Sequence, residues 1–291
     1  MDLINTAKHV ELISKELNLA GRQVSNTIKL LDEGATIPFI SRYRKEMTGN
    51  LDEVQVTSIH DLSAKYVEID KRKETIISTI EEQGKLTDEL KARIINCYDS
   101  VVLEDIYLPY KPKRRTKATI AKEKGLEPLA LLIMKQFERN ILGKAEAFIN
   151  DQVADVDEAL QGARDIVAEW ISEDEKARNI ARRHFKRSAI IKSKVVKGKE
   201  TEGVKYSDYF SFEEEVRKCA SHRFLAMRRG QEEGFLRVPI VPALEPVIEE
   251  FERNYVKLSG DNAAQMQLAI ADSYKRLIEP SIENEFTGEI K

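Results

Sequence analysis

The side chains that most often perform catalysis are few and scattered in this sequence. Its two cysteines, Cys97 and Cys219, lie far apart, and only one of its four histidines, His222, directly follows a serine. Neighbours in sequence rarely face each other as nucleophile and base, so Ser221 and His222 do not predict a hydrolase. Two isolated cysteines are typical of a protein in a reducing cytosol, and the alternative is a single disulfide bond between them.

Signatures of cofactor and metal sites are also missing. The chain has no GxxxxGK[ST], GxGxxG, GxSxG or HExxH pattern and no CxxC pair. Carboxylate pairs, such as Glu104 with Asp105 and Asp155 with Glu158, are more typical of helix starts and charged surface than of acid–base catalysis. We therefore expect no enzyme activity, cofactor, metal or small-molecule substrate in this chain.

Positive charge is concentrated in three clusters, although the whole chain carries 47 basic and 50 acidic residues and a net charge of −3. Residues 111–124 contain seven Lys or Arg and one acid, and residues 182–199 contain eight Lys or Arg and no acid. In chain order, the first cluster is Arg42-Tyr43-Arg44-Lys45, the second is residues 111–124 and the third is residues 182–199. Segregated cations of this kind indicate phosphate binding, because each neutralised phosphate releases counterions.

The predicted contacts to nucleic acid are drawn from these clusters. They are Arg42, Arg44, Lys45, Lys111, Lys113, Arg114, Arg115, Lys117, Arg182, Arg183, Lys186 and Arg187. Tyr107 and Tyr110 flank the second cluster and could stack on bases. The alternative is that these cations form solvated faces or pair with acidic helices of the same protein.

The composition favours a soluble helical protein. Hydrophobic residues make up 42% and charged residues 33%, while the 13 glycines and 8 prolines are too few for a turn-rich β-sandwich or barrel. The first residues form an amphipathic polar helix rather than a signal peptide, and no apolar stretch approaches the roughly 18 residues of a membrane span. We expect a cytoplasmic protein.

Three short helices are predicted at the start of the chain. The first ends near Asn18, the second at Gly34, and a third begins at Pro38 and ends at Gly49. This order resembles a helix-turn-helix, and it is equally common in plain helical bundles. A heptad-like seam then predicts one long helix near 52–82, with Lys73 at the single place where an apolar residue is missing.

The remaining elements are predicted from caps and breakers. Prolines interrupt the helices over 104–124, and capping boxes are expected at Asp155/Glu158, Ser172/Glu175 and Ser211/Glu214. After residue 188 the β-branched pairs favour extended structure, with a short strand over 235–241 and two closing helical patterns. We expect a mainly α, elongated multi-helix scaffold, with a helical domain over 1–187 and a mixed helical and small-sheet region over 188–291.

Four longer stretches carry a family resemblance. They are LLDEGATIPFISRYRKEMTGNLDE (30–53), LEDIYLPYKPKRRTKATIAKEKGLEPLA (103–130), KVVKGKETEGVKYSDYF (194–210) and SHRFLAMRRGQEEGFLRV (221–238). Together they resemble the N-terminal half of the bacterial Tex family of transcription accessory proteins. The sequence is similar, more distantly, to the core of a eukaryotic transcription elongation factor.

This resemblance implies more than the residues alone. Tex proteins place a helical region with a helix-turn-helix before a nuclease-like domain, helix-hairpin-helix elements and an OB-type RNA-binding module. The sequence stops at Lys291, before those modules, so it is expected to be an N-terminal part. The resemblance implies a transcription-associated scaffold that binds RNA or DNA and contacts the transcription machinery. The alternatives are a scaffold docking polymerase or ribosome components, and an enzyme of nucleic-acid metabolism.

Overall fold

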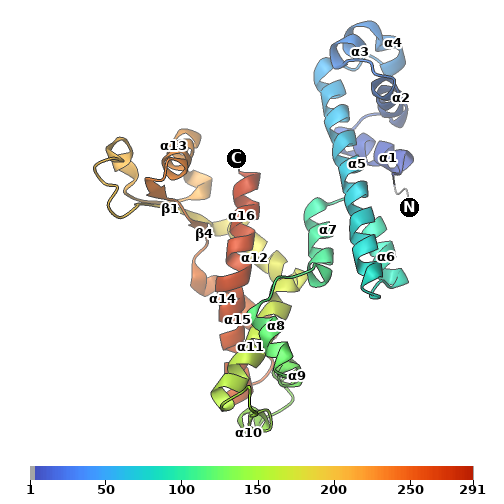
Figure 1. The fold of residues 1–291 in the computed structure, drawn as a ribbon. Helices are drawn as coiled ribbons and strands as arrows, with labels where there is room; N and C mark the ends of the chain where they lie inside the picture. Colours follow the sequence, from blue (N-terminus) through green and yellow to red (C-terminus); the bar gives the residue numbers. More distant parts are fainter. Residues whose placement is uncertain (1–3, 291) are drawn as a thin grey trace. The chain divides into compact units, whose positions relative to one another are not determined.

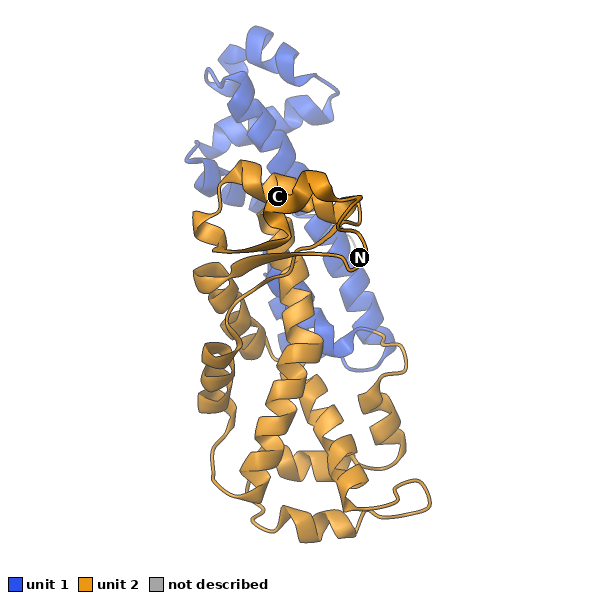
Figure 2. Cartoon of the chain, turned by 90° about the vertical axis from the view of Figure 1, so that its left-hand side faces the viewer, with its two compact units in different colours: residues 1–111 blue, residues 112–291 orange. Residues whose placement is uncertain are grey.

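The computed structural model describes residues 4–290, which are mainly helical with one small sheet (Figure 1). The predicted fold class, mainly α with a small α/β portion, is therefore confirmed. The chain divides into two compact units, residues 1–111 and 112–291 (Figure 2). The boundary expected at residues 187 and 188 falls inside the second unit. In the part of the chain that the structure describes, no helix is both long and apolar enough to cross a membrane.

Unit 1 is helical throughout its described part, residues 4–111. Its elements are α1 (Thr6–Leu17), α2 (Gly21–Asp32), α3 (Ile37–Tyr43), α4 (Lys45–Thr48), α5 (Glu53–Glu82), α6 (Asp88–Ile95), α7 (Ser100–Tyr107) and the 3-10 turn η1 (Leu108–Tyr110). Asn18 and Gly34 adopt left-handed backbone conformations, with φ of 53° and 87°, after α1 and α2. The first two helices therefore end where the sequence predicts.

The longest element of unit 1, α5, confirms the helix predicted near 52–82. Asp52 accepts a hydrogen bond from the Gln55 N–H at 2.8 Å, and the Gln55 side chain accepts one from the Asp52 N–H at 3.1 Å. Its 30 residues rise about 45 Å. The seam faces the core of the unit, and the seam residues buried there include Ile59, Tyr66, Ile69, Lys73, Ile76 and Ile80.

The helix predicted to run from Pro38 to Gly49 is divided in two, which corrects that expectation. Arg44 has φ of −127° and ψ of 27°, outside the helical region, and separates α3 from α4. Gly49, with φ of 68°, ends α4. Figure 1 shows α2, α3 and α4 gathered around one end of α5, with α6 at its other end.

The proline-rich interruption is shorter than the predicted span of 104–124. Helix α7 continues through Tyr107, because Pro109 lies in η1 rather than inside the helix. Helix α8 (Lys117–Glu123) then begins at Thr116, whose hydroxyl accepts a hydrogen bond from the Thr119 N–H at 3.0 Å. The irregular segment is therefore confined to residues 111–116.

Unit 2 combines further helices with the sheet. After α8 its helices are α9 (Glu127–Lys135), α10 (Ile141–Glu146), α11 (Val156–Glu173), α12 (Glu175–Ser188), α13 (Ser221–Glu232), α14 (Leu244–Tyr255), α15 (Asp261–Asp272) and α16 (Glu279–Glu289). Its strands are β1 (Ile190–Val195), β2 (Ser211–Glu215), β3 (Leu236–Arg237) and β4 (Ile240–Val241). The 3-10 turns η2 (Val204–Tyr209) and η3 (Val216–Lys218) flank β2.

Helix α11 is the centre of unit 2, where it packs against α8, α9 and α15. Gly162 allows the close approach of the chain before α9: a Cβ there would lie 2.3 Å from Leu126 Cδ1 and 3.3 Å from Ala121 Cβ. Asp155 caps α11 as predicted, accepting from the Glu158 N–H at 2.8 Å. Glu158, however, reaches back to the Ala154 N–H rather than that of Asp155.

The cap of α12 differs from the prediction. Asp174 caps this helix, accepting from the Lys176 N–H at 2.9 Å. Ser172 lies inside α11 and donates its hydroxyl to the Glu169 carbonyl oxygen at 2.7 Å. A serine can bond backwards in this way within a helix, so the pattern of serine followed by glutamate did not locate the start.

The sheet is organised around β1, which pairs antiparallel with each of the other three strands. The single strand predicted over 235–241 is present as two short strands, β3 and β4, which are separated by Val238 and Pro239 and both pair with β1. The helix start expected at Ser211 and Glu214 is wrong, because Ser211–Glu215 is the strand β2. Phe212 and Glu214 alternate with more exposed neighbours, and this period of two is the signal of a strand.

The chain closes with a continuous helical run in which α15 passes into α16 through a π-helical stretch, η4 (Ser273–Ile278). The Ser273 hydroxyl donates to the Ala168 carbonyl oxygen of α11 at 2.7 Å, inside the core. After this π-helical stretch, Phe286 of α16 packs edge-on against Phe185 of α12, with ring centroids 5.8 Å apart. The π-helical stretch η4 therefore determines which side of α16 faces α12.

Candidate nucleic-acid interface

The first basic cluster lies on α3 and α4 of unit 1. Ile40 and Ser41 are buried, and α3 packs against α5 through this side. Phe39, Arg42 and Tyr43 project from the opposite side and are exposed. Because successive helical residues turn by about 100°, these three share one face of α3.

Two side chains of α2 hold the end of α4 in place. Asn26 donates to the Met47 carbonyl oxygen at 2.7 Å, and Gln23 donates to the carbonyl oxygens of Thr48 and Gly49 at 3.2 and 3.1 Å. These bonds satisfy carbonyls that a helix of four residues leaves without partners. The backbone at the end of α4, next to these cations, is therefore held by hydrogen bonds to α2.

The aromatic and cationic groups of this cluster lie next to one another. The rings of Phe39 and Tyr43 have centroids 5.6 Å apart and are tilted by 41°. The guanidinium carbon of Arg44 lies 5.3 Å from the centroid of the Phe39 ring. Phe39 is 40% and Tyr43 is 66% exposed. We call Phe39, Arg42, Tyr43 and Arg44 the α3 face.

None of the three predicted cations of this cluster, Arg42, Arg44 and Lys45, forms an ion pair with a described residue. Their charge is therefore not offset by a bonded carboxylate among residues 4–111 of unit 1. Such cations remain able to approach an external phosphate. The spacing of Phe39 and Tyr43, one helical turn apart beside these cations, is a signal that charge counting missed.

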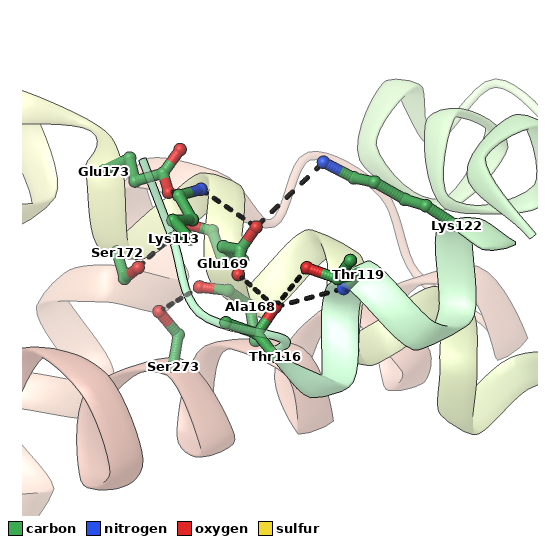
Figure 3. A network of polar contacts seen from close by, with 9 residues as sticks. All are labelled: Lys113, Thr116, Thr119, Lys122, Ala168, Glu169, Ser172, Glu173 and Ser273. Atoms are coloured by element: carbon green, nitrogen blue, oxygen red, sulfur yellow. Dashed lines mark hydrogen bonds and ion pairs between the residues drawn. The ribbon is translucent and has the colours of Figure 1, made fainter. Parts of the chain in front are cut away.

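The second cluster is divided between exposed and anchored cations. Lys113 bonds to the carboxylates of Glu169, at 2.9 Å, and Glu173, both on α11 (Figure 3). Arg115 pairs with Glu123 at 2.9 Å on the surface. Lys111, Arg114 and Lys117 are exposed and form no ion pair within residues 4–290. Lys111 belongs to unit 1, and the other four belong to unit 2.

Figure 3 shows how Lys113 and the start of α8 are fixed to α11. The Thr116 hydroxyl donates to Glu169 at 3.0 Å, so Glu169 holds both ends of the segment 113–116. Burial lowers the pKa of Lys113, but its bonds to Glu173 and Glu169 outweigh burial and raise it. Burial raises the pKa of Glu173, because the charge of Lys113 offsets only part of its desolvation. Lys113 is thus a structural anchor.

Three of the four predicted cations on α12, in the third cluster, are paired with acids of α14 and α16. Arg182 bonds both oxygens of Glu285, at 2.6 and 3.0 Å, and Lys186 lies 3.5 Å from Glu289. Arg183 pairs with Glu250. Arg187 is exposed and forms no ion pair with a described residue. The predicted cluster on α12 therefore mainly joins helices of unit 2.

Glu250 also bonds to His184, whose Nε2 lies 2.7 Å from the carboxylate. Burial raises the pKa of Glu250, but the hydrogen bond to His184 and the charge of Arg183 outweigh it and lower the pKa below the ordinary value. This carboxylate is a shared link between α12 and α14.

The predicted stacking role of Tyr107 is wrong. Its side chain is only 6% exposed, and the guanidinium carbon of Arg72 lies 5.2 Å from its ring centroid. Tyr110 is half-buried beside the same core. Arg72 in turn pairs with Glu104 at 2.6 Å, so Glu104 neutralises a residue of α5 rather than one of the predicted clusters.

Groups that could support other chemistry are sparse in the described residues. Cys97 and Cys219 are free thiols, and burial is the largest factor raising the pKa of each. Within residues 4–290, no three or more His, Cys, Asp or Glu side chains are grouped to hold a metal ion.

Comparison with known proteins shows two matches to family models of Tex-like proteins. Residues 7–81 match the family described as Tex-like protein N-terminal domain, and residues 139–290 match Tex central region-like. The transcriptional accessory protein Tex of Neisseria gonorrhoeae is 43% identical over 243 residues, covering 83% of this chain and 32% of that protein. Protein tex of Bordetella pertussis is 39% identical over 239 residues, covering 81% and 30%.

A more distant relative is human S1 RNA-binding domain-containing protein 1, which is 28% identical over 297 residues, covering 97% of this chain and 30% of that protein. The chain belongs to the Tex family of transcription accessory proteins. It spans about a third of the length of the curated relatives it matches.

Proposed function

We propose that this chain is the N-terminal scaffold of a cytoplasmic Tex protein and that it binds RNA or DNA in association with transcription. The observation that carries the proposal is the cluster of Arg42, Arg44 and Lys45, which has no bonded carboxylate among the described residues of unit 1. Arg42 and Lys45 are exposed and Arg44 is half-buried, and cations next to exposed rings are the composition of a nucleic-acid surface. The S1 RNA-binding domain in the name of a distant relative is consistent with this class of ligand.

The mechanism would be binding without catalysis. Exposed cations approach phosphates, and Arg114, Lys117 and Arg187 offer further positive charge on unit 2. Helix α2, the turn 33–36 and α3 have the order of a helix-turn-helix, and we propose that this element presents the cations. A metal-dependent cleavage assay on the chain should be blank.

Fluorescence anisotropy with labelled RNA and DNA over a salt series tests the proposal. The logarithm of the association constant should fall linearly with the logarithm of salt concentration. Charge reversal of Arg42, Arg44 and Lys45 should reduce this slope by about 0.7 to 0.9 for each lost phosphate contact. Charge reversal of Arg114 and Arg115 measures how much unit 2 contributes to nucleic-acid binding.

Lys85→Glu is the matched control, because this exposed lysine follows α5 at the end opposite α3. It should leave the slope unchanged. The proposal would be refuted if the association constant did not depend on salt concentration and did not change in any of the five charge-reversal variants.

A second candidate function is a protein-interaction scaffold. A cleft of about 270 Å³ lies between α2 and α5, lined by Ile28, Leu31 and Val67 with His60 and Asp32. A cleft lined by both apolar and polar side chains suits one side chain of an amphipathic partner helix. Capture of polymerase or ribosome components that survives nuclease treatment would favour this function.

A further inference from the structure

We propose that the α3 face is a stacking platform for unpaired nucleobases, so that unit 1 binds single strands in preference to duplexes. This inference rests on the proposed function and names its ligand class. It starts from the two exposed rings of Phe39 and Tyr43 and from the guanidinium of Arg44 beside them.

The geometry of the rings leaves stacking surface available. Phe39 and Tyr43 are tilted by 41° rather than stacked on each other, and neither belongs to the hydrophobic core of unit 1. Tyr43 is the more exposed of the two. Aromatic rings exposed on one helix face are otherwise unfavourable in water, and a planar base removes that surface from solvent.

The charges around the rings suit a polyanion. Arg42 shares the α3 face, and Lys45 begins α4 directly after Arg44. Neither is bonded to a carboxylate among the described residues. A strand with bases stacked on the rings brings its phosphates to this neighbourhood, where the cations replace counterions.

The same face is poorly suited to reading a duplex. Helix α3 has seven residues and rises only about 10 Å. Its exposed side chains are Pro38, Phe39, Arg42 and Tyr43, of which only Arg42 has the paired donors that read a guanine edge in the major groove. Bases in a duplex are already stacked on their neighbours, whereas unpaired bases are free to stack on aromatic side chains.

Two 15-nucleotide probes, fluorescein-labelled oligothymidylate and a duplex of equal length, test this inference with the 291-residue chain. We expect tighter binding of the single strand. Tyr43→Ala should weaken single-strand binding about tenfold and leave duplex binding unchanged. The salt slope should persist, because no charge is removed.

Variants at Tyr43 separate stacking from other contacts. Tyr43→Phe should retain binding, and Tyr43→Leu, which keeps apolar area without a ring, should lose it. A strand containing 2-aminopurine should change its emission on binding the natural chain but not Tyr43→Ala. Phe137→Ala is the matched control, because this ring of unit 2 is 84% exposed and should contribute nothing.

The outcomes distinguish the inference from the proposed function. If Arg42→Glu weakens binding while Tyr43→Ala and Tyr43→Leu do not, the stacking platform is wrong and phosphate binding stands. Tighter binding of the duplex would also overturn the platform. If the natural chain binds neither probe, both proposals fail, and a protein partner becomes the better occupant of this face.

Discussion

The ammonium nitrogen of Lys73 lies 2.9 Å from Oδ1 of Asp70, and both side chains are only 1% exposed. Oδ2 of the same aspartate lies 2.7 Å from Nε2 of the buried His9. Lys73 also donates to the Ile95 carbonyl oxygen at 2.9 Å, and its ammonium lies 3.2 Å from the Tyr98 ring centroid. The lysine that interrupts the apolar seam of α5 is therefore a core residue.

Removing this lysine should strongly destabilise unit 1. Lys73→Met leaves Asp70 in the core without its ammonium partner, which typically costs about 3 kcal/mol or more. Urea unfolding followed by far-ultraviolet circular dichroism measures the loss, because the sole tryptophan, Trp170, lies in unit 2. Lys71→Met, at the exposed neighbour, should change stability by less than about 0.5 kcal/mol. Equal effects of the two substitutions would contradict the assignment.

The anchoring of Lys113 to α11 predicts resistance to proteolysis. Lys113→Met removes the ammonium that bonds Glu169 and Glu173, so the segment 111–116 should open more often. Trypsin should then cleave after Arg114 and Arg115 about tenfold faster, as followed by mass spectrometry, because cleavage tracks the opened population.

Lys111→Met is the control for this experiment, because it removes a nearby lysine that has no ion pair among the described residues. Its cleavage rate should match that of the natural chain. Unchanged cleavage of Lys113→Met would show that the backbone holds the segment without this contact.

The shared carboxylate of Glu250 predicts a pH-dependent contribution to stability. Its folded pKa lies below the ordinary 4.5, so its stabilising effect is fully present above pH 4.5 and is lost as pH falls through the folded pKa. Glu250→Gln should cost about 1 kcal/mol at pH 7. The difference from the natural chain should shrink on acidification below pH 4.5.

Unfolding of unit 2 can be followed through the fluorescence of Trp170, at several pH values. Glu249→Gln, at the exposed adjacent position, should show neither the loss nor the pH dependence. A penalty for Glu250→Gln that stays constant from pH 7 to pH 3 would rule out this link.

Local sequence patterns predicted the helices of unit 1 well, because their signals are contained in the helices themselves. The α5 seam and the stops at Asn18, Gly34 and Gly49 needed no distant contact. The prediction failed at Ser211, where a capping pattern and a strand pattern overlap. There the pairing of β2 with β1 decides the structure, and a cap pattern carries no information about a partner strand.

The candidate site was predictable in part for a similar reason. Counting charges found Arg42 and Arg44, but it could not show that Arg182 meets Glu285, because the two residues are 103 positions apart. Nor could it separate exposed Arg114 from anchored Lys113. The spacing of Phe39 and Tyr43 can be read from the sequence, but only the structure shows that both rings are exposed rather than packed in the core.

The π-helical stretch between α15 and α16 has a consequence for related chains of different length. A chain one residue shorter within 273–278 would close this stretch as an ordinary α-helix and rotate everything after it by about 100°. Ile282 and Phe286 would then leave the core beside Phe185. Natural relatives should therefore tolerate length variation in the loops of unit 2 and conserve it strictly here.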